Sequence, residues 1–294
     1  MNRLAQLLVT ALIACACAEA GPMNLVHSER SLYREVRVYE SGGVRCMCFT
    51  RNCRIGRQSC IDIERPDRIV MSYPQMMLGA LYVNPQPKSV LIIGLGGGTL
   101  PRALTQLVPG VRIDVVEIDP AVVRVARKYF EFTAGPNVRV FEMDGRVYVK
   151  RAMREGVRYD LIMLDAFDHE YIPEHLLTRE FLLEVKALLT PGGVLAANTF
   201  SSSRLYDHES VTYESVFPEF FNLKRDNRVI IAVDGGDLPV PDRLRAASEG
   251  FEQGFERLGF SAESLLPLFS TQSDWDRDAR VLTDQYSPAN LLNQ

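Results

Sequence analysis

Two carboxylates three residues apart, Asp165 and Asp168, follow a run of apolar residues and could move a proton. An amine nucleophile is cationic at neutral pH, so it must lose a proton before it can attack. A nearby carboxylate can attract the ammonium group and accept that proton, and burial or a second acid raises the pKa of the carboxylate. The pair therefore predicts deprotonation of an amine. The alternative for Asp168 is that it only caps the following turn.

A glycine-rich turn upstream of this pair predicts a site for a nucleoside. An apolar run ending at residue 93 leads into Gly94, Gly96 and Gly98 and then into a helix. Glycines allow the backbone to approach a ligand closely, and the helix N-terminus offers free N–H groups. Glu117 ends the next strand about 20 residues later, where an acid can accept hydrogen bonds from both ribose hydroxyls.

The third predicted strand ends in Asp144 and Gly145, which places another carboxylate where an adenine amino group could donate to it. Each acid alone could be a solvated strand end or a helix cap. The ordered set of Glu117, Asp144 and Asp165 favours one ligand site, because the carboxyl ends of parallel strands meet at one edge of a sheet.

Composition and the remaining polar residues narrow the function classes. The chain has 294 residues, 47% hydrophobic and 24% charged, which is typical of a soluble globular protein. A net charge of -4 gives no electrostatic footprint for a nucleic-acid partner. His169 and His175 show no metal-ligand geometry, so we expect no metal and interpret their segment as a loop that covers the substrate.

Short apolar strands alternate with amphipathic helices from residue 89 onward. We expect strands at residues 89–93, 111–118, 138–143, 159–165 and 193–199, helices at 100–107, 120–130, 145–154 and 178–189, a late antiparallel pair at 220–223 and 229–233, and a helix at 242–258. Near-continuous apolar strands require a parallel sheet covered on both faces. The fold class is therefore α/β, a Rossmann-like, doubly wound and mostly parallel sheet.

A smaller unit precedes this sheet. Residues 32–39 and 44–49 are β-rich runs separated by Ser41-Gly42-Gly43, a hairpin signal, and residues 60–63 add a third run. These runs predict a small antiparallel domain. We divide the chain into a leader at 1–22, an N-terminal β-domain at 23–70, a Rossmann-like nucleoside-binding catalytic domain at 71–235 and a C-terminal helical extension at 236–294.

The leader is typical of an export signal. Arg3 precedes an apolar run of about eleven residues, which is too short to span a bilayer. The sequence Leu-Ile-Ala-Cys ending at Cys15 resembles a bacterial lipobox, in which this cysteine would carry a lipid anchor, whereas Ala16-Cys17-Ala18 suits ordinary cleavage. We expect an exported protein, periplasmic or anchored by lipid. If translation starts at Met23, the protein is cytoplasmic.

Four further cysteines lie within fifteen residues, at Cys46, Cys48, Cys53 and Cys60. In an exported protein they would form two disulfides, in any of three pairings. In a cytosolic protein they would be free thiols or a metal site, although the spacing lacks the paired C-x2-C units of usual zinc sites.

These motifs together resemble spermidine synthase and its polyamine aminopropyltransferase relatives. The resemblance covers roughly residues 30 to 230 and rests on Ser72-Tyr73, the run from Asn84 to Gly94, Glu117-Ile118-Asp119, Asp144-Gly145 and Asp165-x-x-Asp168. It implies a fold of the S-adenosylmethionine-dependent methyltransferase type. It further implies that Glu117 binds ribose, Asp144 contacts adenine and Asp165 is the catalytic base, while Tyr73 and Asp168 line a diamine pocket.

The resemblance also implies the reaction and its partners. Decarboxylated S-adenosylmethionine would be a co-substrate rather than a permanently bound cofactor, and the acceptor would be a diamine such as putrescine. The superfamily commonly forms dimers, so a homodimer is expected.

Some residues depart from the synthases. Gly97 stands where they carry an aspartate that holds the aminopropyl amine, and their later substrate-binding tyrosine has no match. The run Gly-Leu-Gly-Gly-Gly-Thr-Leu-Pro and the tail at residues 281–288 resemble a bacterial spermidine-synthase-like branch, while the same glycines followed by Glu-Ile-Asp-Pro resemble a eukaryotic lysine and N-terminal methyltransferase domain. Two alternatives therefore stay open: methyl transfer from unmodified S-adenosylmethionine, and an exported nucleoside- or polyamine-binding protein without turnover.

Overall fold

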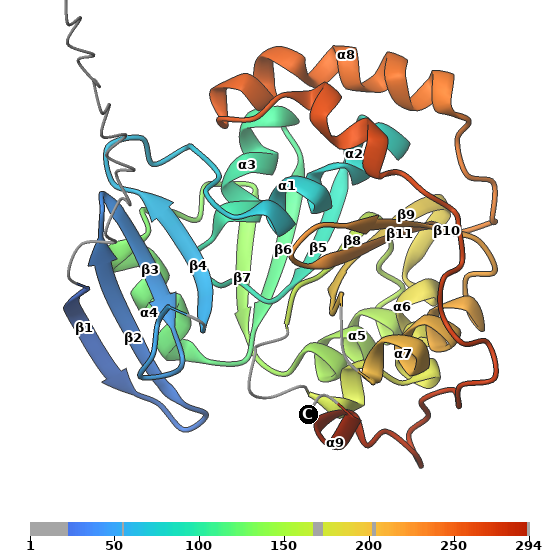
Figure 1. The fold of residues 1–294 in the computed structure, drawn as a ribbon, viewed down its shortest axis with the longest axis horizontal. Coiled ribbons are helices and arrows are strands. Elements are labelled where there is room, and N and C mark those ends of the chain that lie inside the picture. Colours follow the sequence, from blue (N-terminus) through green and yellow to red (C-terminus); the bar gives the residue numbers. More distant parts are fainter. Residues whose placement is uncertain (1–22, 55, 167–172, 202–203, 293–294) are drawn as a thin grey trace, which may run out of the picture.

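The structure is a computed structural model that describes residues 23–54, 56–166, 173–201 and 204–292 (Figure 1). It contains a four-stranded sheet formed by the N-terminal residues and a seven-stranded sheet formed by the rest. The expected leader with Cys15 lies outside the described residues, as do Asp168 and His169. The domain boundaries after residues 22, 70 and 235 stay a prediction.

The N-terminal sheet is antiparallel, with its strands in chain order. They are β1 (Asn24–Arg30), β2 (Glu35–Ser41), β3 (Val44–Cys48) and β4 (Arg57–Asp62). The predicted hairpin is confirmed, and its two glycines, Gly42 and Gly43, have positive φ angles that glycine adopts without strain. The sequence does not predict β1, because this mostly exposed edge strand has a polar sequence and forms by pairing with β2.

Two disulfides hold this sheet. Cys46 pairs with Cys60 across β3 and β4, with Cα atoms 4.1 Å apart, and Cys48 pairs with Cys53, with Cα atoms 5.5 Å apart. All four side chains are buried. The structure thus selects one of the three pairings that the sequence leaves open. Within the described ranges, no group of three His, Cys, Asp or Glu side chains could hold a metal ion.

The seven-stranded sheet has the order β10-β11-β9-β8-β5-β6-β7. Its strands are β5 (Ser89–Ile93), β6 (Arg112–Glu117), β7 (Val138–Glu142), β8 (Tyr159–Leu164), β9 (Leu189–Thr199), β10 (Phe220–Lys224) and β11 (Arg228–Val233). The first five run parallel, and β10 and β11 form the expected antiparallel pair at one edge. The predicted α/β fold class is confirmed. β9 begins at Leu189 rather than at residue 193, because Leu189 already pairs with Tyr159 of β8.

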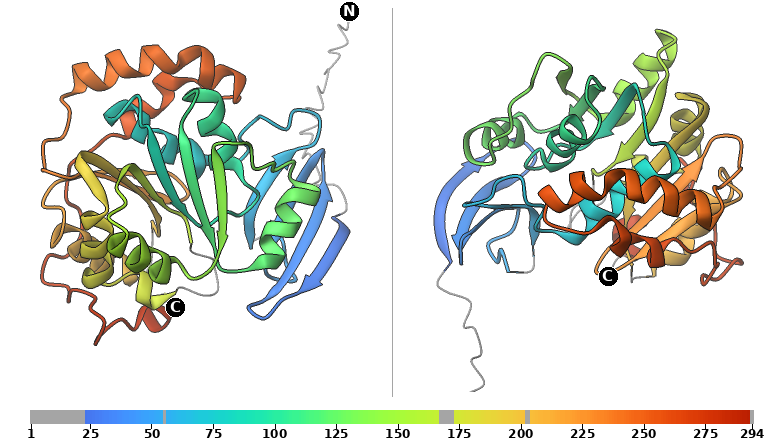
Figure 2. Two further views of the ribbon diagram at one scale, coloured as in Figure 1. Left: turned by 180° about the vertical axis from the view of Figure 1, so that it is seen from behind. Right: turned by 90° about the horizontal axis from the view of Figure 1, so that it is seen from above.

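Helices cover both faces of this sheet (Figures 1 and 2). They are α1 (Ser72–Leu78), α2 (Ala80–Val83), α3 (Thr99–Leu107), α4 (Pro120–Tyr129), α5 (Gly145–Arg154), α6 (Arg179–Ala187), α7 (Leu205–Glu214), α8 (Pro241–Arg257) and α9 (Ala289–Leu292), with the short 3-10 helices η1 (Glu174–Leu176) and η2 (Ala262–Leu268). One core joins α1, α2, α3 and α8 to the sheet, and a second joins α5, α6 and α7 to the other face. α4 packs between the two sheets.

The sequence predicts α3 to α6 and α8 but not α1, α2 or α7. α7 lacks an apolar stripe because it buries polar side chains, among them Glu209, Ser210 and Thr212, beside its apolar ones. α1 has seven residues and no side-chain cap at its N-terminus, so it has no start signal. Among the helices of the described residues, none is long and apolar enough to cross a bilayer.

Candidate active site

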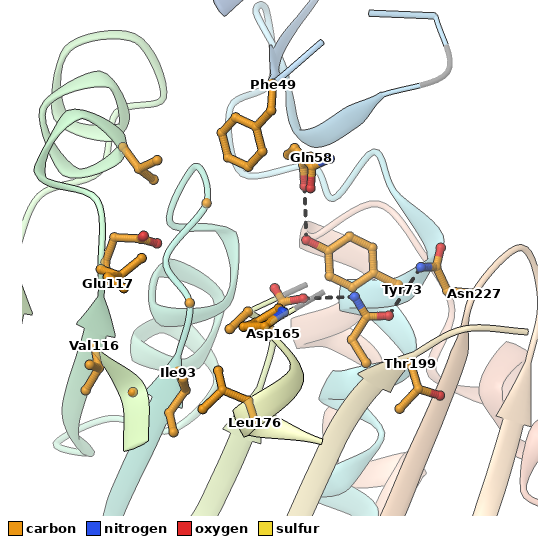
Figure 3. A pocket seen from close by; sticks show the side chains of 18 of the residues that line it. Phe49, Gln58, Tyr73, Ile93, Val116, Glu117, Asp165, Leu176, Thr199 and Asn227 are labelled. Atoms are coloured by element: carbon orange, nitrogen blue, oxygen red, sulfur yellow. Dashed lines mark hydrogen bonds between the residues drawn. The ribbon is translucent and has the colours of Figure 1, made fainter. Parts of the chain in front are cut away.

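A cleft of about 650 Å³ opens at the carboxyl ends of β5, β6, β8 and β9, facing the N-terminal sheet (Figure 3). The predicted site residues that line it are Tyr73, Gly94, Gly96, Glu117, Asp144, Gly145 and Asp165. Sheet topology brings them together from separate parts of the chain, as the strand-end argument requires. Their individual chemical roles stay predictions. Gly98 does not line the cleft: a side chain there would meet the ring of Phe132 at 2.5 Å.

Gly94 sets the spacing of the site. Its φ is 101°, and a Cβ atom there would collide with the backbone carbonyl of Asp165. The N–H of Asp165 donates to the carbonyl of Ile93 at 2.7 Å, so the ends of β5 and β8 are joined directly. Only glycine allows this approach, which places the predicted base beside the nucleoside turn.

Glu117 is held by backbone groups at the end of β6. One carboxylate oxygen accepts from the N–H of Leu95 and the other from the N–H of Asp119, each at 3.0 Å. Burial raises the pKa of Glu117, and these two hydrogen bonds oppose the rise. A carboxylate has about four lone-pair sites, so the other two can accept from a pair of vicinal hydroxyls. This arrangement suits the predicted contact with ribose.

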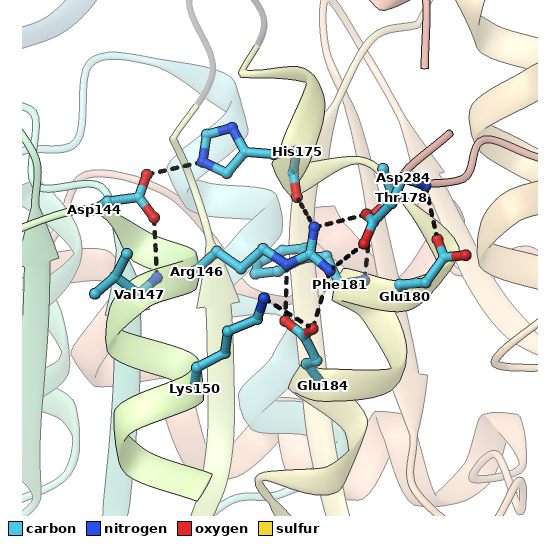
Figure 4. Close-up of polar contacts among 10 residues, drawn as sticks. All are labelled: Asp144, Arg146, Val147, Lys150, His175, Thr178, Glu180, Phe181, Glu184 and Asp284. Atoms are coloured by element: carbon cyan, nitrogen blue, oxygen red, sulfur yellow. Dashed lines mark hydrogen bonds and ion pairs between the residues drawn. The ribbon is translucent and has the colours of Figure 1, made fainter. Parts of the chain in front are cut away.

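Asp144 has two partners, one of which the sequence does not indicate (Figure 4). It caps α5, where Oδ1 accepts from the N–H of Val147 at 2.9 Å, and its Oδ2 lies 2.8 Å from Nε2 of His175 on η1. The hydrogen bond with His175 is the main cause that lowers the pKa of Asp144. The cap and the cleft-lining position therefore coexist, and an adenine amino group would share Oδ2 with His175.

Asp165 differs from Glu117 and Asp144 in the groups that bond its carboxylate. Its Oδ1 accepts from Nδ2 of Asn198 at 3.0 Å, and Oδ1 of Asn198 accepts in turn from Nδ2 of Asn227 at 3.3 Å (Figure 3). Burial raises the pKa of Asp165 to about 7. A base works best when its pKa is near the working pH, so this carboxylate suits proton transfer from an amine.

Tyr73 stands beside Asp165 and stays neutral. Its hydroxyl donates to the backbone carbonyl of Gln58 on β4 at 3.3 Å. Burial, together with the negative charge of Asp165, raises the pKa of Tyr73 well above its usual value. The contact with Gln58 ties this wall of the cleft to the disulfide-bonded sheet.

Three residues of the site escape the sequence argument: His175, Asn198 and Asn227. Asn198 follows the same rule as the acids, since it lies near the carboxyl end of β9 and an extended search for strand-end polar residues would have found it. His175 belongs to the segment expected to cover the substrate, but its contact with Asp144 has no sequence signal. Asn227 sits in the turn between β10 and β11, and its role depends on tertiary packing.

Residues 71–219 match the family described as spermine/spermidine synthase domain. A polyamine aminopropyltransferase from Vibrio vulnificus is 47% identical over 277 residues, which covers 92% of each chain. The chain belongs to the spermine/spermidine synthase family.

Solved structures show the same fold. Spermidine synthase from Thermotoga maritima superposes with a TM-score of 0.62 at 20% identity and covers 84% of each chain. Human methyltransferase-like protein 13, solved in complex with SAH, has a TM-score of 0.57 at 23% identity and covers 76% of this chain and all of that one. The fold of this synthase-family protein is thus shared with methyltransferases, as the sequence predicts.

The departure of this synthase-family protein at Gly97 is built into its packing. A Cβ atom at this position would lie 2.7 Å from Oγ of Ser59 on β4 and 2.9 Å from the ring of Phe130 after α4. Gly97 is absent from the cleft lining. An aspartate here would require Ser59 or Phe130 to move, so the amine of a donor needs another partner among the acids of the cleft.

Proposed function

We propose that this protein is a polyamine aminopropyltransferase, which transfers an aminopropyl group from decarboxylated S-adenosylmethionine to a diamine such as putrescine. The observation that carries the proposal is the position of Asp165, with a pKa raised to about 7, in the same cleft as the nucleoside-binding residues. The similarity to the Vibrio vulnificus enzyme named polyamine aminopropyltransferase supports it, because that similarity extends over nearly the whole chain.

The ribose of the donor would bind Glu117 and its adenine would bind Asp144. The glycine turn lets the backbone lie close to the donor, because glycine has no side chain in the way. The sulfonium already supplies the leaving group, so the protein contributes mainly by orienting the reactants. Asp165 accepts a proton from the ammonium form of the acceptor amine. The freed nitrogen pair attacks the methylene carbon beside sulfur, a C–N bond forms, and the C–S bond breaks with its electron pair on sulfur. Methylthioadenosine leaves as the neutral product.

The experiment is incubation of the purified protein with decarboxylated S-adenosylmethionine and putrescine, followed by chromatography for methylthioadenosine and spermidine. Both products should appear in equal amounts. If neither appears while S-adenosylhomocysteine accumulates from unmodified S-adenosylmethionine, the protein is instead a methyltransferase. If methylthioadenosine binds but neither reaction occurs, a binding protein without turnover is supported.

Methyl transfer is the second candidate because of Gly97. Its position leaves no carboxylate from the glycine turn in the cleft, and such a carboxylate would repel the carboxylate of an intact methionine group. An acceptor screen with unmodified S-adenosylmethionine tests this candidate directly.

We also propose that the protein is exported and that residues 1–22 are removed or lipidated. The charged and apolar pattern of these residues supports export, and so does the pairing of all four downstream cysteines, since disulfides persist in oxidising compartments. Mass spectrometry of the mature N-terminus separates cleavage, lipid attachment at Cys15 and translation from Met23. The homodimer expected from the family is tested on the same sample by sedimentation velocity.

A further inference from the structure

The C-terminal segment at residues 281–290 contacts a wall of the nucleoside site. Leu282 is fully buried against Leu177 and Leu205. Its N–H donates to Oγ1 of Thr212 and its carbonyl accepts from the N–H of Arg179, both at 2.9 Å. The segment therefore docks where α6 begins, just after η1.

Asp284 in this segment bonds residues of α5 and α6 and the residue that caps α6 (Figure 4). Its carboxylate accepts from both terminal nitrogens of Arg146, at 2.6 and 2.8 Å, and from Oγ1 of Thr178 at 2.7 Å. Its backbone N–H donates to Glu180 at 3.0 Å. The pKa of Asp284 is lowered mainly by its bond to Arg146. One residue of the tail thus joins the starts of α5 and α6.

Arg146 carries this connection to the cleft. It follows Asp144 and Gly145 at the start of α5, and it is 8% exposed. Its five N–H donors are all used: two bond Asp284, two bond Glu184 on α6 at 2.9 Å each, and one bonds the backbone carbonyl of His175 at 3.3 Å. A guanidinium with every donor occupied has one favourable position.

The segment also holds η1 from its other side. Oγ of Ser287 donates to the carbonyl of Glu174 at 3.1 Å, and the Glu174 carboxylate accepts from the N–H and the side-chain amide of Asn290. His175 and Leu176, the next residues of η1, line the cleft. The C-terminal segment therefore holds η1 at two points: directly at Glu174, and through Arg146 at the backbone carbonyl of His175. These contacts fix the backbone from which the His175 side chain contacts Asp144.

We propose that the C-terminal segment positions the nucleoside site, with Asp284 and Arg146 as positioning residues that set where His175 and Leu176 stand against Asp144. The proposal rests on the proposed function only in that the cleft binds an adenine nucleoside. A segment that merely covered the apolar cluster around Leu282 would change the stability of the folded protein without changing its affinity for a nucleoside.

The test is Asp284→Asn in the full chain, with methylthioadenosine as the probe in titration calorimetry well below the unfolding temperature. We expect affinity to fall by about 10-fold, since a small displacement of positioning groups acts strongly on a bound ligand. Asp274→Asn is the matched control: Asp274 precedes the C-terminal segment, so the substitution removes the same charge outside it, where the partners are Lys224 and Tyr206. Its affinity should stay within about twofold of the parent protein.

The proposal is overturned if Asp284→Asn binds methylthioadenosine like the parent, or if Asp274→Asn weakens binding equally. Asp284→Glu keeps the charge and should restore part of the affinity. If Asp284→Asn does not fold, Asn290→Ala removes the side-chain amide that donates to Glu174 and keeps the backbone N–H that donates to the same carboxylate. It should still raise the KM for the donor while kcat stays near that of the parent. The two proposals can fail separately. If the parent binds methylthioadenosine but catalyses no transfer, and these variants lose the binding, the proposed function is refuted and this proposal stands.

Discussion

The two sides of the cleft hold their carboxylates by different means. On the donor side, backbone N–H groups bond both oxygens of Glu117 and one oxygen of Asp144. On the acceptor side, Asp165 is bonded through its carboxylate by the side chain of Asn198, which comes from another strand. Burial raises the pKa of both Glu117 and Asp165, and two backbone N–H groups oppose the rise at Glu117. At Asp165 the side chains of Asn198 and Tyr73 oppose it, and the pKa still reaches about 7. The comparison separates the acids that bind from the acid that reacts.

The largest expected effect is on the reacting side. Asp165→Asn should lower the transfer rate at least about 100-fold, because the amide cannot accept the proton of the amine, while methylthioadenosine binding stays nearly unchanged. Asp160→Asn on the same strand is the control, since Asp160 bonds Lys88, Ser89 and Thr190 away from the cleft. Rates come from release of methylthioadenosine. A normal transfer rate in Asp165→Asn would show that Asp165 is not the base, and the distinction between a reacting side and a binding side would be wrong.

The same substitution should stabilise the folded protein above neutral pH. The pKa of Asp165 is raised to about 7 in the folded state, so its ionisation costs stability as the pH rises from about 4 to about 7. Replacing it with a neutral side chain removes that cost, roughly 2 to 4 kcal/mol at pH 8. Urea unfolding of both proteins at pH 8 and pH 4 measures it. A gain of the same size at both pH values would contradict the explanation.

On the binding side, Glu117→Gln should weaken donor and methylthioadenosine binding by about 10- to 100-fold. The amide presents an NH2 group to one of the backbone N–H groups that the carboxylate satisfied. At saturating donor the rate should change much less. Glu142→Gln is the control, because Glu142 lies directly opposite on β7 and is exposed. An equal loss in both variants would mean that charge at this edge matters, not the ribose contact.

The pH dependence tests how the reacting side is tuned. The rate at saturating substrates should fall as the pH drops through about 7, since Asp165 must be ionised to accept a proton. Asn198→Ala removes the amide donor that lowers the pKa of Asp165, so the midpoint should move upward by about one pH unit. Asn227 bonds Asn198 and not Asp165, so Asn227→Ala should move the midpoint less. A midpoint that shifts downward in Asn198→Ala would exclude this hydrogen bond as the cause.

The smallest expected effect is that of Tyr73→Phe. It removes the hydroxyl that bonds the Gln58 carbonyl and that also lowers the pKa of Asp165. The substitution should raise the KM for the amine by about fivefold, with the KM for the donor unchanged. Tyr82→Phe is the control, because Tyr82 makes the same kind of bond to the carbonyl of Ala262 outside the cleft. If the KM for the donor rises instead, Tyr73 belongs to the donor side.

The donor side is predictable from sequence because its chemistry is local. The limits of α5 at Gly145 and Arg154 match the prediction, since Asp144 is both a strong cap and the end of a strand. Gly94 and Glu117 follow from the order of strands alone. Contacts between elements far apart in the chain leave no such signal, so Asn227 on the acceptor side and His175 beside Asp144 on the donor side escape any periodic pattern. α7 escapes for a related reason: its buried polar groups conceal the stripe that marks a helix.

The close approach of Gly94 to the carbonyl of Asp165 means that two properties can change independently in evolution: the spacing between base and nucleoside turn, and the preference for an acceptor. The span between base and nucleoside turn is set by two backbones in van der Waals contact and is insensitive to exchange of the side chains around them. The turn between β10 and β11 borders the cleft at Asp226 and Asn227, and Asn227 bonds Asn198 through its side chain. Substitutions in that turn can therefore change the acceptor preference while the spacing between Asp165 and the nucleoside turn stays the same.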